Sequence, residues 1–223
     1  MSIAKIIGVT QPVNLDIKTP EDLVAYAARV SNPSNQLNSS TASKLLKYLA
    51  KHKHWSPFEM VSVVMEINTT RDIARQMLRH RSFSFQEFSQ RYALVDELGF
   101  EYKEARLQDH KNRQNSIEVN DRELQDLWRE LQQDVIRKAK QTYAWAITNG
   151  IAKEQARAVL PEGLTNSRLY MSGTLRSWIH YCELRCDVAT QKEHRVVAQS
   201  CRDQLVDQFP ALKEFFIGDS IEQ

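Results

Sequence analysis

The sequence predicts a mixed α and β fold in one domain spanning residues 1–223. Runs rich in β-branched residues at 5–9 and 62–70 are typical of strands, whereas a longer stretch at 120–149 repeats apolar residues at helical spacing. No linker rich in Pro, Gly or Ser divides the chain, and no internal repeat occurs. With 223 residues, 42% of them hydrophobic, the chain can bury a sizeable core.

Strong local signals mark the first elements. After the strand at 5–9, the segment TPED indicates a helix start, with Thr19 as the cap and Pro20 at the first helical position. Asp22 reaches back to the cap residue and completes a capping box. A second helix is expected at 41–52, where leucines recur at helical spacing.

The next segment combines a strand and a helix. The run at 62–70 is β-rich, and Thr70 is expected to cap a helix at 71–81 that has one apolar side. In contrast, residues 95–119 are polar and only weakly periodic. We expect an irregular excursion on the surface there.

The second half of the chain is mainly helical. Asn120 is expected to cap its longest helix, with Glu123 completing a box and Gly150 ending the helix. An apolar stripe runs along this helix, formed by Leu124, Leu127, Leu131 and Val135. After it we expect a short helix, a strand and two further helices, at 152–159, 167–172, 174–186 and 188–208.

The segment RHRSFSFQEFSQRY, residues 79–92, places much charge in a stretch that otherwise resembles a strand. In extended backbone one face carries Phe83, Phe85, Glu87, Ser89 and Arg91, and the other carries Ser84, Gln86, Phe88 and Gln90. A solvated edge strand would explain part of this charge. It does not explain why polar residues continue the row that the aromatic residues begin.

Cationic and amide side chains converge near this segment. Gln76 and Arg79 are three residues apart on the predicted helix, so they can face one ligand. Guanidinium groups bind phosphate through two parallel hydrogen bonds, and a carboxylate accepts from a ribose hydroxyl or a ring N–H. The pattern therefore favours a nucleotide over bare phosphate. Arg157, Arg185 and the Arg176/His180 pair are further candidates, although each alone could be an ordinary surface residue.

Composition excludes some classes of protein. Lys and Arg number 30 against 28 Asp and Glu, so the net charge of +2 does not itself indicate nucleic-acid binding. No stretch approaches eighteen apolar residues and no signal peptide is present, so we expect a cytoplasmic protein without a membrane span. Cys182, Cys186 and Cys201 lack a CxxC and zinc-ligand spacing, which indicates reduced packing thiols and no metal site.

The 79–92 segment closely resembles the signature of the flavin-dependent thymidylate synthases, R-H-R-x-x-S-x-N-E-x-S-x-R-Y. It differs at Gln86, where the family usually has Asn. Further similarities cover most of the chain, namely AARVS at 27, HWSPFE at 54, RQMLRHR at 75, ARAVLP at 156, and the R-x-D-x-x-x-Q-x-E pattern that starts at Arg185.

The resemblance implies an activity and an architecture. Family members convert dUMP to dTMP with methylenetetrahydrofolate as carbon donor, while FAD passes on the reducing equivalents of NADPH. The family uses no cysteine nucleophile. Its fold is an α/β fold of the α+β type, with helices covering a mainly antiparallel sheet, and its members are homotetramers whose sites are shared between subunits.

The resemblance also implies roles for individual residues. The dUMP site corresponds to Gln76, Arg79, Glu87, Phe88, Ser89, Gln90, Arg91, Arg157 and Arg185. The FAD site corresponds to Arg79, His80, Arg81, Glu87, Arg176 and His180, with Ser56, Glu59 and Thr174 matching more weakly. His54 corresponds to a residue beside the flavin and folate. Arg185 is the expected catalytic residue, because a fixed cation at the uracil ring stabilises negative charge that builds there.

Two other classes remain open on the residues alone. A nucleic-acid-binding protein without catalysis could use the RHR segment and its aromatic residues as a charged stacking surface. A structural or interaction protein could use the arginines at an interface, and it would need no cofactor. The near-neutral charge and the dispersal of the arginines over three distant segments argue against nucleic-acid binding.

Overall fold

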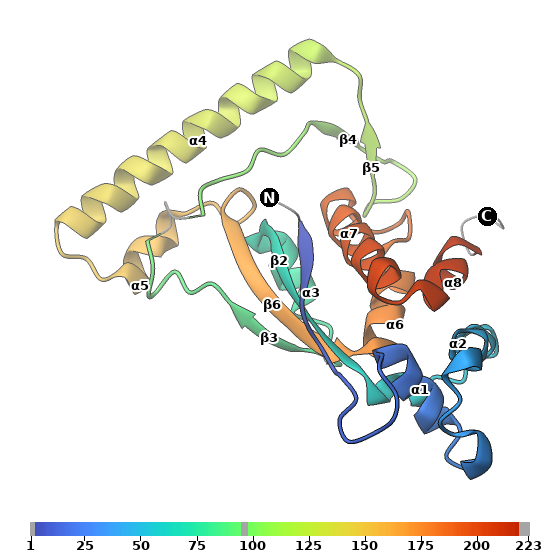
Figure 1. Cartoon of the computed structure of the whole chain (residues 1–223). Helices are drawn as coiled ribbons and strands as arrows, with labels where there is room; N and C mark the ends of the chain where they lie inside the picture. Colours follow the sequence, from blue (N-terminus) through green and yellow to red (C-terminus); the bar gives the residue numbers. More distant parts are fainter. Residues whose placement is uncertain (1–2, 95–97, 219–223) are drawn as a thin grey trace.

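A four-stranded antiparallel sheet forms the centre of the computed structural model, which describes residues 3–94 and 98–218 (Figure 1). Its strand order is β1-β2-β6-β3, and each neighbouring pair is antiparallel. The strand bounds are Ala4–Val9 for β1, Ser62–Thr70 for β2, Ser84–Glu87 for β3 and Asn166–Thr174 for β6. The expected antiparallel sheet and its predicted strands are therefore confirmed.

Helices cover the sheet, as the resemblance implied (Figure 1). Helices α3, α6 and α7 contact the central strands, and α1 packs on α2. The α-helices are α1 Pro20–Ala28, α2 Ala42–Lys51, α3 Arg71–Met77, α4 Arg122–Thr148, α5 Lys153–Ala156, α6 Leu175–Arg185, α7 Lys192–Gln208 and α8 Lys213–Gly218. Short 3₁₀ segments are η1 Pro33–Asn35, η2 Ser39–Thr41, η3 Ser56–Met60, η5 Arg157–Val159 and η6 Pro210–Leu212. The sequence did not predict α8.

The core lies between the sheet and α6 and α7. Strand β2 turns its alternate residues Val63, Met65 and Ile67 inward, and all three are fully buried. Helix α6 adds Trp178, whose indole N–H donates to the carbonyl oxygen of Val63 at 3.0 Å. A buried indole N–H needs such an acceptor, so this bond fixes the orientation of the ring against the sheet.

The predicted helix starts are confirmed in part. Thr19 and Asp22 form the expected capping box. For α4 the predicted cap was wrong by one position, because Asp121 rather than Asn120 accepts from the N–H of Leu124. Adjacent Asn and Asp are almost equally good caps, so the sequence does not distinguish them. Thr70 precedes α3 but makes no capping bond.

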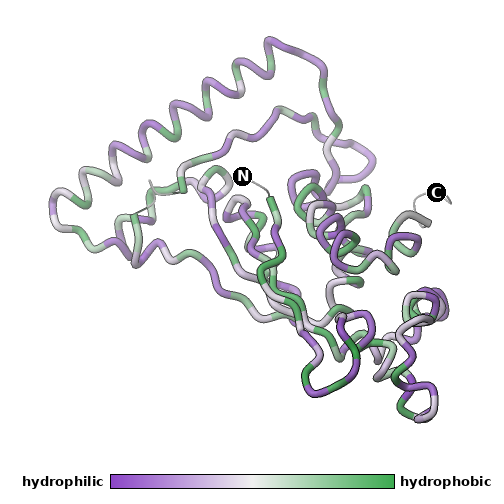
Figure 2. The backbone as a smooth tube through the Cα atoms, viewed as in Figure 1, coloured by the Kyte–Doolittle hydropathy of each residue, from purple (hydrophilic) through white to green (hydrophobic). Residues whose placement is uncertain are grey.

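The apolar stripe of α4 forms, but three of its four residues remain largely exposed. Leu127, Leu131 and Val135 are each about half exposed, whereas Ile136 and Ala139, farther along α4, are buried. Figure 1 shows α4 on the side of the molecule opposite α1 and α2, and Figure 2 shows hydrophobic residues recurring along its length.

The segment expected to be irregular contains a small sheet. Strands β4 Arg106–Gln108 and β5 Ser116–Glu118 pair antiparallel, so the prediction of an irregular excursion was wrong for these residues. We call residues 103–118 the arm. It lies between α4 and α7 (Figure 1). Residues 95–97, which belong to the same prediction, lie outside the described residues.

Strand β3 confirms the predicted alternation only as far as Glu87. It is an edge strand, with Phe85 and Glu87 half-buried and Ser84 and Gln86 exposed. Beyond it the chain turns, because the N–H groups of Tyr92 and Ala93 both donate to the carbonyl oxygen of Ser89. The expected continuous row from Phe83 to Arg91 was therefore wrong. Among the residues with described coordinates, no helix is long and apolar enough to cross a membrane.

Candidate active site

The first group of predicted site residues lies where the C-terminal end of α3 meets α6 and α7. Helix α3 ends at Met77, earlier than predicted, so Arg79 and His80 follow in a turn. The guanidinium of Arg185, at the end of α6, donates from Nε to Nε2 of His80 at 3.0 Å. His80 must be neutral to accept this bond. Burial and the charges of Arg185 and Arg79 lower the pKa of His80, in agreement with that requirement.

Gln76 belongs to the same group and connects it to α7. Its amide nitrogen donates to Oε1 of Gln191 at 2.7 Å, and its amide oxygen lies 3.2 Å from Nδ1 of His194. A pocket of about 450 Å³ opens here, lined by Gln76, Arg185 and Gln191 together with Gln114 of the arm. Sequence reasoning assigned no role to Gln191, although it lies in the matched R-x-D-x-x-x-Q-x-E pattern, or to His194.

Arg79 and Arg81 are exposed and lie on either side of His80 in the chain. Within the two described ranges, neither guanidinium has a hydrogen-bond or ion-pair partner. Exposed guanidinium groups without a partner are available to bind an anion, and phosphate is the anion that their planar donors match best.

A second group lies beside α5 and contains Ser89, Arg91 and Arg157. Arg91 Nη2 lies 3.6 Å from a carboxylate oxygen of Glu154, and Arg157 donates to the carbonyl oxygen of the same residue at 3.3 Å. A pocket of about 420 Å³ is lined by Ser89, Arg91 and Glu154. No hydrogen bond or ion pair between described residues joins this group to the Arg185 group. Arg91 and Arg185 line two different pockets that have no residue in common.

Three further predicted site residues, Gln90, Phe88 and Glu87, differ from one another in their surroundings. Gln90 is buried, and its amide nitrogen has no hydrogen-bond partner in the part of the chain that is described. Phe88 is half-buried. The carboxylate of Glu87 accepts from the hydroxyl of Ser167 at 2.7 Å and pairs with Arg71 at 3.4 Å, so it already ties β3 to β6 and α3.

A third group surrounds the start of α6. Arg176 forms an ion pair with Glu59, and His180 Nδ1 lies 3.0 Å from Glu183. The ring of His180 also lies 5.0 Å from that of Trp55. The remaining predictions here are Ser56, which begins η3, Thr174, whose hydroxyl caps α6, and His54, which is exposed and follows α2.

The cysteines have the character of packing residues, as predicted. Cys182 and Cys201 are buried and Cys186 is half-buried, and all three are free thiols. Burial raises the pKa of Cys182 and Cys201, which disfavours the thiolate that a nucleophile requires. No group of three or more potential metal ligands occurs among the residues of the described ranges.

Comparison with known proteins gives one consistent result. The family model described as thymidylate synthase complementing protein matches residues 14–211. The probable flavin-dependent thymidylate synthase of Paramecium bursaria Chlorella virus 1 is 51% identical over 209 residues, covering 94% of this chain and 96% of the viral protein. The flavin-dependent thymidylate synthase of a Synechocystis species is 48% identical over 211 residues, covering 93% and 96%.

The fold agrees with these sequence relationships. The crystal structure of the UMP/dUMP methylase PolB from Streptomyces cacaoi, bound with 5-Br dUMP, aligns with a TM-score of 0.79 at 26% identity. The alignment covers 96% of this chain and 94% of PolB. Because the family model and near-half-identical relatives each span most of the chain, the chain belongs to the family of flavin-dependent thymidylate synthases.

Proposed function

We propose that this protein methylates dUMP to dTMP, with methylenetetrahydrofolate as carbon donor and NADPH, through FAD, as reductant. The observation that carries the proposal is the pocket lined by Arg185 and Gln76, in which Arg185 is held by the neutral His80. A neutral histidine that accepts from Arg185 leaves the guanidinium fully charged and limits its rotation. These contacts support a substrate whose ring gains negative charge during the reaction.

The residues of this chain fit FAD. The unpaired cations Arg79 and Arg81 are suited to the diphosphate of FAD. The third group, which includes Arg176, also contains the adjacent aromatic rings of Trp55 and His180. Residues that we assign to FAD are Ser56, Glu59, Arg79, His80, Arg81, Glu87, Thr174, Arg176 and His180, with His54 beside the flavin and folate. Once reduced by NADPH, bound FAD would supply the reducing equivalents for the new methyl group.

For dUMP we assign two tasks to different residues. Arg185 is the catalytic residue, because a cation at the uracil ring interacts more strongly with the charge that develops in the transition state than with the neutral ring. Arg91 and Arg157 are suited to the phosphate, since both are cations with a single weak partner, Glu154. The complete set is Gln76, Arg79, Glu87, Phe88, Ser89, Gln90, Arg91, Arg157 and Arg185.

We infer that the protein acts as a homotetramer with shared sites. Two observations support this inference. Arg91 and Arg185 line two pockets that share no residue, and a site assembled from two copies would bring both to one substrate. The half-exposed Leu127, Leu131 and Val135 on α4 also form an apolar surface that a monomer would leave in water. Sedimentation equilibrium should give four times the chain mass, and a monomer would contradict the inference.

We also infer one domain for residues 1–223. A single large core joins the sheet to helices α1, α2, α3, α6 and α7, whereas Tyr143, Ala146 and Ala156 form only a small cluster between α4 and α5. A cluster of that size is too small to fold alone. The α4 region is therefore an extension of the domain.

The proposed reaction replaces the hydrogen on C5 of the uracil with a methyl group, which gives a direct test. FAD-loaded protein should release tritium from 5-tritiated dUMP and form dTMP only when methylenetetrahydrofolate and NADPH are both present. Protein that carries FAD but releases no tritium would contradict the proposal. Salt-sensitive retention of an oligonucleotide by protein without flavin would instead favour the nucleic-acid-binding alternative.

Arg91→Ala is expected to weaken dUMP binding more than FAD binding. Loss of a charge-assisted contact to phosphate costs about 1.5–3 kcal/mol, which corresponds to a rise in the dUMP Kd of roughly ten- to 150-fold. Titration calorimetry with dUMP, and the flavin absorbance of the purified protein, measure the two effects. Arg122→Ala is a matched control, because Arg122 is an exposed arginine that pairs with Asp126. Unchanged dUMP affinity with loss of FAD would contradict the assignment.

A further inference from the structure

We propose that Glu193, held by Arg106 of the arm, is a positioning residue that sets the orientation of the Gln76 amide in the dUMP pocket. The proposal rests on the proposed function, because it takes Gln76 as a dUMP ligand. Glu193 itself lies outside the residues that line this pocket. It acts through Gln191, the residue that separates it from Gln76.

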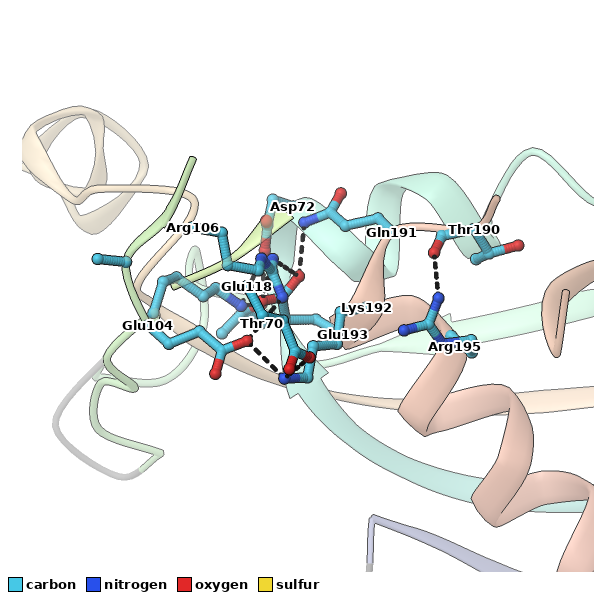
Figure 3. Close-up of polar contacts among 12 residues, drawn as sticks. Thr70, Asp72, Glu104, Arg106, Glu118, Thr190, Gln191, Lys192, Glu193 and Arg195 are labelled. Atoms are coloured by element: carbon cyan, nitrogen blue, oxygen red, sulfur yellow. Dashed lines mark hydrogen bonds and ion pairs between the residues drawn. The ribbon is translucent and has the colours of Figure 1, made fainter. Parts of the chain in front are cut away.

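A continuous chain of hydrogen bonds connects the arm to the pocket. Arg106 Nη2 donates to both carboxylate oxygens of Glu193, at 2.6 and 2.8 Å, and Gln191 Nε2 donates to one of them at 2.9 Å (Figure 3). Gln76 Nε2 then donates to Gln191 Oε1 at 2.7 Å. Arg106, Glu193, Gln191 and Gln76 therefore form one polar chain that joins β4, α7 and α3.

The carboxylate of Glu193 fixes the direction of this polar chain, that is, which neighbour the NH₂ group and the oxygen of each amide face. An ionised carboxylate only accepts hydrogen bonds, so Gln191 must turn its NH₂ group toward Glu193 and its oxygen toward Gln76. Gln76 must then turn its own NH₂ group toward Gln191 and its oxygen toward His194. Each amide has one possible orientation as long as Glu193 is ionised.

The far end of the polar chain is consistent with this direction. The oxygen of Gln76 requires a donor, so Nδ1 of His194 carries the hydrogen and Nε2 is free to accept from the hydroxyl of Tyr181, 3.1 Å away. Only a neutral imidazole can do both. His194 is fully buried, and burial, together with the charge of Arg185 and then His80, lowers its pKa to about 3.

The arm keeps Glu193 ionised. The side chains of Arg106 and Glu193 are 12% and 16% exposed. Burial alone would raise the pKa of Glu193, but hydrogen bonds from Arg106 and Gln191 outweigh it and leave the pKa below its usual value. Lys192 also bridges Glu104 and Glu118 at the two ends of the arm, at 2.8 and 2.6 Å (Figure 3). The arm thus delivers the arginine on which the orientation of Gln76 depends.

The orientation determines what Gln76 offers to a ligand. One N–H of its amide is used by Gln191, so the second remains available as a donor in the pocket beside Arg185. A uracil carbonyl or a phosphate oxygen, both acceptors, would match this pair of donors. An inverted amide would move both N–H groups toward different partners and remove this match.

Glu193→Gln tests the proposal, because the variant keeps the shape of the side chain while it loses the negative charge and the acceptor-only character of the carboxylate. If the new amide turns its oxygen to Arg106, its NH₂ group faces Gln191, and every amide down to Gln76 must invert. We expect the dUMP Kd, measured by calorimetry on FAD-loaded protein, to rise about five- to tenfold, the loss of one oriented hydrogen bond. Flavin content and kcat at saturating dUMP should change much less.

A double-mutant cycle with Gln76→Ala separates positioning from a general structural effect. Gln76→Ala should weaken dUMP binding, and adding Glu193→Gln to this variant should cause no further loss of dUMP affinity. Glu118→Gln is the matched control, because it breaks an ion pair between the arm and Lys192 without touching the polar chain, and it should bind dUMP like the wild type.

Two results would overturn the proposal while leaving the proposed function intact. One is a wild-type dUMP Kd in Glu193→Gln. The other is an equal loss of dUMP affinity from Glu193→Gln whether or not Gln76 is present, which would show that Glu193 acts independently of Gln76. Absence of dUMP binding by the wild-type protein would contradict the proposed function, and with it this inference.

Discussion

Arg185→Lys is expected to slow the reoxidation of reduced flavin by dUMP and methylenetetrahydrofolate together about 100-fold or more, the scale seen when one preorganised donor is removed from a developing charge. Lysine keeps the positive charge but loses the planar arrangement of donors. In this protein it also loses the Nε–H that donates to His80, so the cation would no longer be held in one place beside the pocket.

A stopped-flow record of flavin reoxidation at saturating dUMP and methylenetetrahydrofolate measures this effect. The variant should still bind FAD and still accumulate reduced flavin with NADPH. Arg157→Lys is the matched control. Arg157 is expected at the phosphate, so its variant should show mainly weaker dUMP binding. Reoxidation at the wild-type rate in Arg185→Lys would place Arg185 outside the chemistry.

Trp178→Ala is expected to lower the free energy of unfolding by about 3–5 kcal/mol, a large part of the 5–15 kcal/mol typical of a folded protein. The side chain is fully buried between the sheet and the rings of Phe83 and Tyr181, and its N–H donates to Val63. Its removal leaves a cavity and takes one hydrogen bond from the carbonyl oxygen of Val63.

Urea titrations at one fixed protein concentration compare the variants, because assembly also contributes to apparent stability. Trp178→Phe is the control. It keeps an aromatic ring in the core and removes the indole N–H, so its free energy of unfolding should fall by clearly less than that of Trp178→Ala. A Trp178→Ala protein within 1 kcal/mol of the wild type would show that the core closes around the missing ring.

The segment at residues 79–92 illustrates how much of the structure sequence pattern alone can predict. Alternation predicted β3, and residues 84–87 confirm it. The row was nevertheless expected to continue through Ser89 to Arg91, where the backbone instead bonds to itself in a turn. The edge-strand interpretation was correct for the position of β3 in the sheet, and it does not account for the two unpaired arginines before the strand.

The sequence by itself determined the local features of this protein: the strands, most helices, the Thr19 capping box and a signature specific enough to indicate the family. These depend on residues within a few positions of one another, and the periods of strand and helix record them directly.

Only the tertiary structure decided which distant side chains meet. His80 and Arg185 are 105 positions apart, Gln76 and His194 are 118 apart, and Arg106 and Glu193 are 87 apart. No local pattern encodes such contacts, because they arise when packing of the core fixes α3, α6, α7 and the arm relative to one another. The same packing leaves most of the stripe on α4 exposed, since apolar spacing indicates that a face will be covered but not which surface covers it.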